Sequence, residues 1–380
     1  MAARRGVLKL LGGGVVVAAT AGGGYAVLDR PSETAREPWR RAGRYDDLRK
    51  RALSYAILAP NPHNRQPWLV RLDADDALAL YVDLKKRLPA TDPLDRQTTL
   101  GCGAFLELLS IAAAEEGVGA EIKAFPEGED PATLDERPIA TVRFVKDAAR
   151  RDPLFAHILY RRSNREVYEK RDVPAEALAA LAAPTTGLNA ALSVTGNTAL
   201  AASLRNLTWR AHVRETATPA ANQESVDLMR IGAAEVSRNP DGLVFEGAMI
   251  EVARRVGFVS REALADPKSA GFRQGLELYR AKAFSARAFG WIANGNASRA
   301  DQIDAGRAYA RMNLKATALG LSVHPWSQAL QEYPEMQDLY REAHALIGMG
   351  ATLQMLYRIG YAKPVRPAPR RALEAHFVQA

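Results

Sequence analysis

The chain contains one cysteine, Cys102, among its 380 residues. A single cysteine excludes an intrachain disulfide, a Cys-x-x-Cys redox pair and a cysteine-rich metal site. The sequence also lacks the His-Glu-x-x-His zinc motif, the Gly-x-x-x-x-Gly-Lys-Ser/Thr phosphate-binding loop and the Gly-x-Ser-x-Gly nucleophile elbow. Two Gly-x-Gly segments, at 101–103 and 348–350, lack the third glycine of a dinucleotide fingerprint. No metal site is therefore expected.

The excess of basic residues does not form a patch. The net charge is +8, but lysine and arginine are scattered among acidic residues and are not interleaved with aromatic ones. We therefore expect no nucleic-acid partner. Hydrophobic residues make up 47% of the chain and charged residues 25%, which is typical of a globular protein with a sizeable core.

Residues 1–28 read as a targeting segment. Arg4, Arg5 and Lys9 precede an uncharged, glycine-rich run from 10 to 28. This pattern resembles a twin-arginine export signal, with Ala19-Thr20-Ala21 as a candidate cleavage site. A plain membrane anchor and a general secretory signal are alternatives, because the run is long enough to span a bilayer. We expect a periplasmic protein, or one anchored to the outer face of the cytoplasmic membrane, whose membrane contact is limited to this segment.

After a polar linker at 29–44, the chain reads as two α+β halves, at 45–150 and 151–373. Periodicity predicts a helix from Tyr45 to Leu58, strands at Trp68–Leu72, Leu78–Val82 and Ile139–Val145, and a long helix from Arg96 to Gly117. The second half is predicted to hold a strand at Ala191–Thr195, several helices between Thr198 and Leu319, and a strand at Leu353–Tyr361. Each half contains a long helix that ends at glycine, so a divergent duplication is plausible.

The segment from Ala59 to Trp68, APNPHNRQPW, is the most informative for function. Its prolines restrict φ, and asparagine tolerates unusual backbone angles, so the loop is expected to hold amide groups in a rigid concave array. Such an array suits a flat polar ligand. An ordinary helix-to-strand connection is the alternative.

A second candidate is the basic stretch from Arg161 to Arg165, RRSNR. If the segment is extended, Arg161, Ser163 and Arg165 project on one face and suit a phosphate and a ribityl chain. A solvated basic turn is the alternative.

Both segments resemble motifs of the nitroreductase family, Ala-Pro-Ser-x-x-Asn-x-Gln-Pro-Trp and Arg-x-Ser-x-Arg/Lys, with Asn61 in the place of serine. In ordinary members the basic motif comes first, and one FMN site takes its two motifs from opposite subunits. Here the order is reversed. The resemblance therefore implies a nitroreductase-like fold in a fused pseudo-dimer of antiparallel sheets flanked by helices, as in the Acg-type branch.

The resemblance implies a set of FMN contacts. The flavin ring would lie against Pro60, Asn61, Pro62, Asn64 and Gln66 of the loop. The phosphate and ribityl groups would meet Arg161, Arg162, Ser163 and Arg165, with Arg370 and Arg371 closing on the phosphate. The pyrimidine edge would meet Pro325, Trp326 and Ser327. The aromatic segment from Ala281 to Ser298 would be a lid, or alternatively a core helix followed by an Asn-Gly turn.

No residue is assigned to catalysis. His324 and His63 are candidate proton donors or packed residues, and Cys102 is a candidate thiolate or a small packing residue. The resemblance implies an oxidoreductase that passes electrons through FMN to an electron-poor small molecule, such as a nitroaromatic or a quinone. If the protein is exported, its donor is expected to be a quinol or a redox protein. The alternative is a flavin-sequestering protein with a covered site and little turnover.

Overall fold

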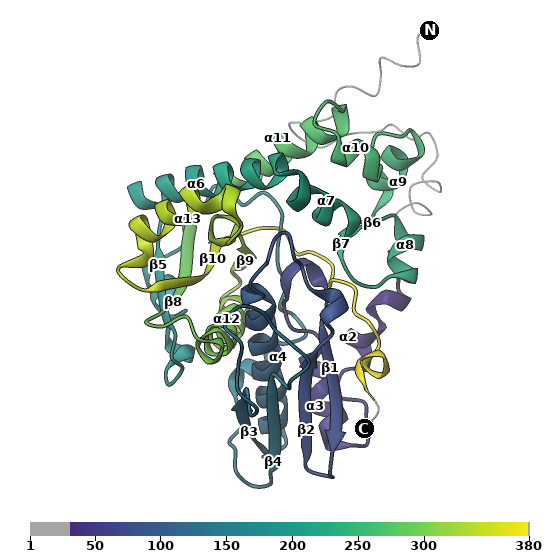
Figure 1. The fold of residues 1–380 in the computed structure, drawn as a ribbon, viewed down its shortest axis with the longest axis vertical. Coiled ribbons are helices and arrows are strands. Elements are labelled where there is room, and N and C mark those ends of the chain that lie inside the picture. Colours follow the sequence, from purple (N-terminus) through teal and green to yellow (C-terminus); the bar gives the residue numbers. More distant parts are fainter. Residues whose placement is uncertain (1–30, 379–380) are drawn as a thin grey trace.

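The computed structural model describes residues 31–378 and contains two four-stranded antiparallel sheets, one in each half of the chain (Figure 1). The α+β class and the antiparallel sheets flanked by helices are therefore confirmed. The targeting segment predicted for residues 1–28 lies outside the described residues.

The first sheet has the strand order β1-β2-β4-β3. The first half contains α3 (Leu48–Ala56), β1 (Trp68–Asp73), β2 (Ala77–Val82), α4 (Arg96–Glu115), β3 (Gly119–Ala124) and β4 (Ala140–Val145). The segment predicted as a polar linker contains a short helix, α2 (Glu37–Arg41), whose Trp39 is buried. The predicted first helix begins three residues later than expected, because the Asp47 side chain accepts hydrogen bonds from the backbone N–H groups of Arg49 and Lys50 and so caps it. The sequence prediction missed β3, a half-exposed edge strand that pairs only with β4.

The second sheet has the order β5-β8-β10-β9. Its half contains α5 (Ala175–Ala179), β5 (Ala191–Thr195), α6 (Ala199–Ala217), β8 (Ala288–Asn294), α12 (Arg299–Ala318), β9 (Ser322–Pro325), α13 (Gln337–Ala343) and β10 (Thr352–Gly360). The predicted strands at 191–195 and 353–361 are confirmed. The segment around His324 is the edge strand β9, which pairs with β10.

The prediction of a lid, or of a core helix, at 281–298 is wrong. Residues 281–284 are the end of a helix, and residues 288–294 form β8, an inner strand that pairs with both β5 and β10. Phe289 and Trp291 of this strand are buried. A strand that is covered on both faces lacks the alternation of apolar and polar residues that identifies most strands. Its run of apolar and aromatic residues therefore resembles the sequence of a buried helix or a lid.

A different segment, residues 219–284, lies between α6 and β8 and is called the cover segment here. It contains α7 (Pro219–Asp227), β6 (Met229–Ile231), α8 (Ala233–Arg238), β7 (Leu243–Phe245), α9 (Ala248–Arg255), α10 (Arg261–Ala265) and α11 (Ala270–Phe284). Figure 1 shows these elements gathered at one end of the molecule, away from the hairpin end of the first sheet.

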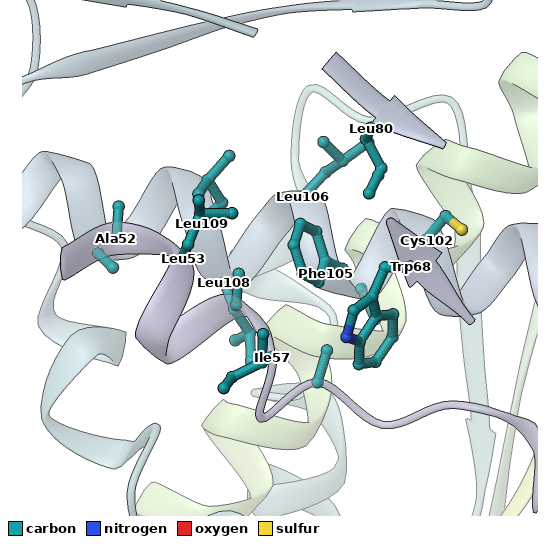
Figure 2. Close-up of a cluster of buried hydrophobic side chains, with 14 of the residues drawn as sticks. Ala52, Leu53, Ile57, Trp68, Leu80, Cys102, Phe105, Leu106, Leu108 and Leu109 are labelled. Carbon is teal, nitrogen blue, oxygen red and sulfur yellow. The ribbon is translucent and has the colours of Figure 1, made fainter. Parts of the chain in front are cut away.

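Helix α4 is buried around almost its whole circumference, and this is why its sequence is apolar on every side. One side packs on the first sheet and α3, where Trp68 and Phe105 lie with ring centroids 5.0 Å apart (Figure 2). Cys102 is fully buried in the same cluster, and burial raises the pKa of its thiol to about 12. The structure therefore favours the packing interpretation of Cys102. Within the described residues, α4 is the one helix long and apolar enough to cross a membrane, and it is a core helix here.

The opposite side of α4 touches α12, and the contact is backbone to backbone. A Cβ atom on Gly103 would lie 2.2 Å from the carbonyl oxygen of Ile303, and one on Gly306 would lie 2.0 Å from the carbonyl oxygen of Leu100. The neighbouring Gly101 faces the motif loop, where a Cβ would lie 3.2 Å from Cβ of Asn61. The two glycines of the Gly-Cys-Gly segment thus leave room for the loop and for α12.

Replacing Gly306 by alanine is expected to separate the two helices. We expect Gly306→Ala to lower the free energy of unfolding by about 1–3 kcal/mol, because the added methyl group meets backbone that cannot move aside. Chemical denaturation of the purified proteins measures the change.

Gly275 in α11 is the matched control, because a Cβ there meets no atom within 4 Å. Gly275→Ala is expected to raise stability by roughly 0.5–1 kcal/mol through helix propensity alone. Equal effects of the two substitutions would contradict the close contact.

Candidate functional site

A cavity of about 270 Å³ lies where the two halves and the cover segment meet. The first half contributes residues of the motif loop and of α4, and the second half contributes residues of α6, α12 and the segments around 163–165 and 324–331. The cover segment adds mostly apolar side chains. The wall includes Pro60, Asn61, Pro62, His63, Gln97, Leu100, Gly101, Ser163, Arg165, His212, Glu215, Tyr279, Tyr309, His324, Pro325, Ser327, Gln328, Gln331 and Met355.

The motif loop has the unusual backbone that its composition indicates. His63, Asn64 and Gln66 have φ of 46°, 53° and 50°, a region that residues with a side chain rarely occupy. The Asn61 side chain holds the turn closed, because its Oδ1 accepts from the backbone N–H of Gln66 at 2.7 Å and its Nδ2 donates to the carbonyl of Ala59 at 3.1 Å. Asparagine at this position thus supplies both a donor and an acceptor to the loop.

Pro60, Asn61 and Pro62 line the cavity, whereas Asn64 and Gln66 do not. Asn64 Oδ1 accepts from Arg370 at 2.6 Å, and Gln66 Nε2 donates to the carbonyl of Pro240 at 2.9 Å. Gln66 also accepts from the backbone N–H of Arg371 at 2.8 Å. These two amides hold the strained loop against the C-terminal segment and the cover segment, so the structure gives them a supporting place behind the cavity wall.

In the basic motif, Ser163 and Arg165 face the cavity. The segment runs beside β9, where Ser163 forms a bridge with Val323 and the backbone N–H of Asn164 donates to the Val323 carbonyl at 2.9 Å. No ion pair formed within residues 31–378 involves Arg165. Its guanidinium is therefore available to an anion.

Arg161, Arg162 and Arg370 form a separate cluster behind the motif loop and do not line the cavity. Arg161 and Arg370 both donate to the carbonyl of Leu58, at 3.1 and 3.0 Å, and Arg162 and Arg370 lie over the ring of Trp39. Nε and Nη1 of Arg161 and Nε of Arg370 have no hydrogen-bond partner among the described residues.

No carboxylate within residues 31–378 forms an ion pair with these three arginines. Burial lowers the pKa of Arg161 to about 10, and burial followed by the charges of Arg161 and Arg162 holds the pKa of Arg370 well below its usual range. A buried guanidinium without a counter-ion is costly, so the cluster is electrostatically suited to an anion.

The four remaining candidates lie in different places. Pro325 and Ser327 line the cavity, and Ser327 Oγ donates to the Leu356 carbonyl at 2.8 Å. Trp326 is buried behind them and donates from Nε1 to the Thr208 carbonyl. Arg371 contacts the outer side of the motif loop at the Gln66 carbonyl.

His324 is a neutral hydrogen-bond donor in this geometry. Its Nδ1 accepts from Nε of Arg358 at 3.1 Å, and because a guanidinium can only donate, the ring proton lies on Nε2. Burial, followed by the charges of Arg358 and Arg165, holds the pKa of His324 well below its usual range. Burial likewise lowers the pKa of His63 to about 4. Neither imidazole is a protonated acid at neutral pH.

The polar wall residues that the sequence prediction missed include His212 and Glu215 on α6, and Gln331 after the short helix η6 (Gln328–Leu330). His212 stacks on Tyr279 of α11, with centroids 4.2 Å apart. Nothing in the local sequence of α6 marks these residues, since only the position of the cover segment turns one side of α6 toward the cavity.

Comparison with known proteins adds relatives along most of the chain. The Mycobacterium tuberculosis protein named "Putative NAD(P)H nitroreductase Rv3131" is 28% identical over 345 residues, which is 84% of this chain and 88% of the relative. The M. tuberculosis protein named "Putative NAD(P)H nitroreductase acg" is 38% identical over 105 residues, 27% of this chain and 31% of the relative. The chain is similar to nitroreductases. In the match to the acg protein, this chain spans less than a third of the relative's length. No protein-family model matches.

Solved structures give a weaker likeness. The FMN-dependent nitroreductase NfnB from Mycobacterium smegmatis, solved in complex with NADPH, has a TM-score of 0.36 and 18% identity, over 58% of this chain and 94% of that one. The resemblance to nitroreductases found in the sequence agrees with the name of the relative that matches 84% of this chain.

His212 is expected to make the protein sensitive to acid. Burial lowers the pKa of His212 to about 4, below the value of 6.5 for a free histidine. Between these values the unfolded chain binds a proton that the folded chain does not, so stability falls as the pH falls through this window. At pH 5 this residue alone is expected to cost about 2 kcal/mol relative to pH 7.5.

Denaturant unfolding of the wild-type protein and His212→Gln at both pH values measures this contribution. The difference in stability between the two pH values is expected to shrink by about 2 kcal/mol in the variant. An unchanged difference would show that His212 protonates equally well in the folded chain.

Proposed function

We propose that this protein is an FMN-binding oxidoreductase of the nitroreductase type, in the Acg-type branch. It passes electrons from a reduced donor through FMN to an electron-poor acceptor such as a nitroaromatic or a quinone. The observation that carries the proposal is the cavity, whose wall contains residues of both motifs, Asn61 from the first half and Ser163 and Arg165 from the second. A fused pseudo-dimer with one flavin site requires the ring loop of the first half and the basic motif of the second half to line the same cavity.

The polar groups of the site fit FMN. Arg165 is an unpaired cation in the wall, and buried nitrogens of Arg161, Arg370 and His63 lack partners within residues 31–378. In the proposed site Pro60, Asn61 and Pro62 position the ring, while Ser163 and Arg165 hold the phosphate and ribityl groups. Arg161 and Arg370 add positive potential from behind the loop. FMN, when bound, supplies the electron-transfer chemistry.

The chain's own side chains would orient the ligands and keep water out. His324 presents a fixed Nε2–H donor, whose tautomer is set by Arg358. The apolar cover segment closes one end of the cavity, and a closed site strengthens the hydrogen bonds inside it.

The donor is proposed from two considerations. The relatives are named NAD(P)H nitroreductases, which supports a nicotinamide cofactor. The twin-arginine pattern of residues 1–28 supports an exported protein in the periplasm or at the outer face of the cytoplasmic membrane, where a quinol or a redox protein is the more accessible donor.

Arg165 is expected to bind the FMN phosphate. Arg165→Ala should weaken FMN binding at least about tenfold and leave riboflavin binding unchanged, because a charge-assisted hydrogen bond to phosphate is lost. Titration of the flavin-free protein with each flavin, followed by flavin fluorescence, gives the ratio of the two affinities.

Arg171→Ala is the control for that titration, because Arg171 lies over the ring of Tyr361 at an exposed position outside the cavity wall. A ratio of FMN to riboflavin affinity that is the same in wild type and Arg165→Ala would place the phosphate elsewhere.

Turnover is tested with the flavin-loaded protein. We expect its visible flavin absorbance to bleach under anaerobic NADH, NADPH or a quinol, and to return when a nitroaromatic or a quinone is added. Bleaching by dithionite but by none of these donors would contradict the enzyme and indicate a flavin-sequestering protein. Absence of a flavin spectrum after reconstitution with FMN would exclude both.

A further inference from the structure

The end of the cavity beside α6 carries an unusual surplus of hydrogen-bond acceptors. Gln331 Nε2 donates to Glu215 Oε2 at 2.9 Å, and both residues are more than nine-tenths buried. This bond fixes the orientation of the amide, so Gln331 Oε1 is left as an acceptor. Gln331 Oε1 and Gln328 Oε1 both lack a hydrogen-bond partner among the described residues.

Two of the nearby donors are already used inside the protein, whereas the hydroxyl of Ser225 on α7 has no hydrogen-bond partner among the described residues. Asn222 Nδ2 donates to the Ala265 carbonyl, and Thr216 Oγ1 donates to the Val213 carbonyl at 2.9 Å. Glu215 is the one carboxylate in the part of the wall that residues 31–378 form. A ligand with hydrogen-bond donors would satisfy the acceptor oxygens of Glu215, Gln328 and Gln331.

The surrounding wall is apolar and suits a flat ring. It is formed by Met229, Leu243, Phe245, Leu264, Phe272 and Leu276 of the cover segment. The stacked pair of His212 and Tyr279, with ring planes inclined at 18°, forms a flat side of the same wall. An aromatic body with a polar edge fits such a surface.

We propose that this end of the cavity is a subsite for an aromatic ligand with a free hydroxyl group, which donates to Glu215 and Gln331. The class includes hydroquinones, the reduced forms of quinones. The proposal rests on the proposed oxidoreductase function, because it names the substrate class of the same cavity.

The charge of Glu215 makes the subsite dependent on pH. The pKa of Glu215 is raised to about 7, and burial is the main cause. The hydrogen bond from Gln331 acts to lower this pKa, and the charge of Glu224 acts to raise it. The titratable groups that face it are Glu224 from α7, Tyr333 after η6 and His212 from its own helix. The carboxylate accepts a hydroxyl hydrogen better than the neutral acid does, so binding should tighten as the pH rises from 6 to 8.

Naphthol and its methyl ether test this proposal, because they share a ring system and differ in the hydroxyl hydrogen. With the flavin-loaded protein, calorimetric titration at pH 8 is expected to give at least about tenfold tighter binding of naphthol. Glu215→Leu should abolish this preference, whereas Glu215→Gln should keep part of it and lose its dependence on pH. Equal binding of the two probes by the wild-type protein would overturn the proposal.

Glu277→Leu is the matched control, because Glu277 is an exposed carboxylate on α11 outside the cavity wall. It should bind both probes as the wild type does. Flavin content is recorded for every variant. If the protein binds no flavin and still prefers naphthol, the proposed function alone is contradicted. If the flavin-loaded variant Glu215→Leu keeps the preference for naphthol, the subsite alone is contradicted.

Discussion

The backbone contact between α4 and α12 is the constraint on which the rest of the structure depends. Gly103 and Gly306 bring the two helices together without intervening side chains, and Glu107 on α4 pairs with Arg307 and Arg311 on α12 beside this contact. Because each helix carries its own sheet, their separation sets the position of one half relative to the other. Leu100 and Gly101 of α4 and Tyr309 of α12 line the cavity that the two halves share.

The same helix also positions the motif loop. Gly101 leaves the space that Asn61 and Pro62 fill, so the loop lies directly on α4 next to the helix contact. The strained backbone of the loop is then held from behind by Asn64 and Gln66, through the C-terminal segment and the cover segment. Packing and hydrogen bonding thus stabilise a backbone that would otherwise relax.

Charge is distributed unevenly around the cavity. Arg165 lies in the wall and three further arginines lie behind the loop, with no paired carboxylate among the described residues. Glu215 and unpartnered amide oxygens lie in the same wall beside the cover segment. In our proposal Arg165 binds the cofactor phosphate, the arginines behind the loop add positive potential, and the acceptor groups bind the substrate hydroxyl. One cavity thus orients two molecules by opposite electrostatics.

The sequence by itself determined the α+β class, the hairpin of β1 and β2, and the long helix α4, since each has a strong local period or turn signal. It also singled out the two motifs, because prolines, asparagines and paired arginines restrict the local backbone and charge. Tertiary structure alone decided that β8 is an inner strand, that Arg161 lies behind the loop while Arg165 faces the cavity, and that His212 and Glu215 belong to the wall. The physical reason is that burial and contact with residues far along the chain set these outcomes, and neither is encoded in a local period.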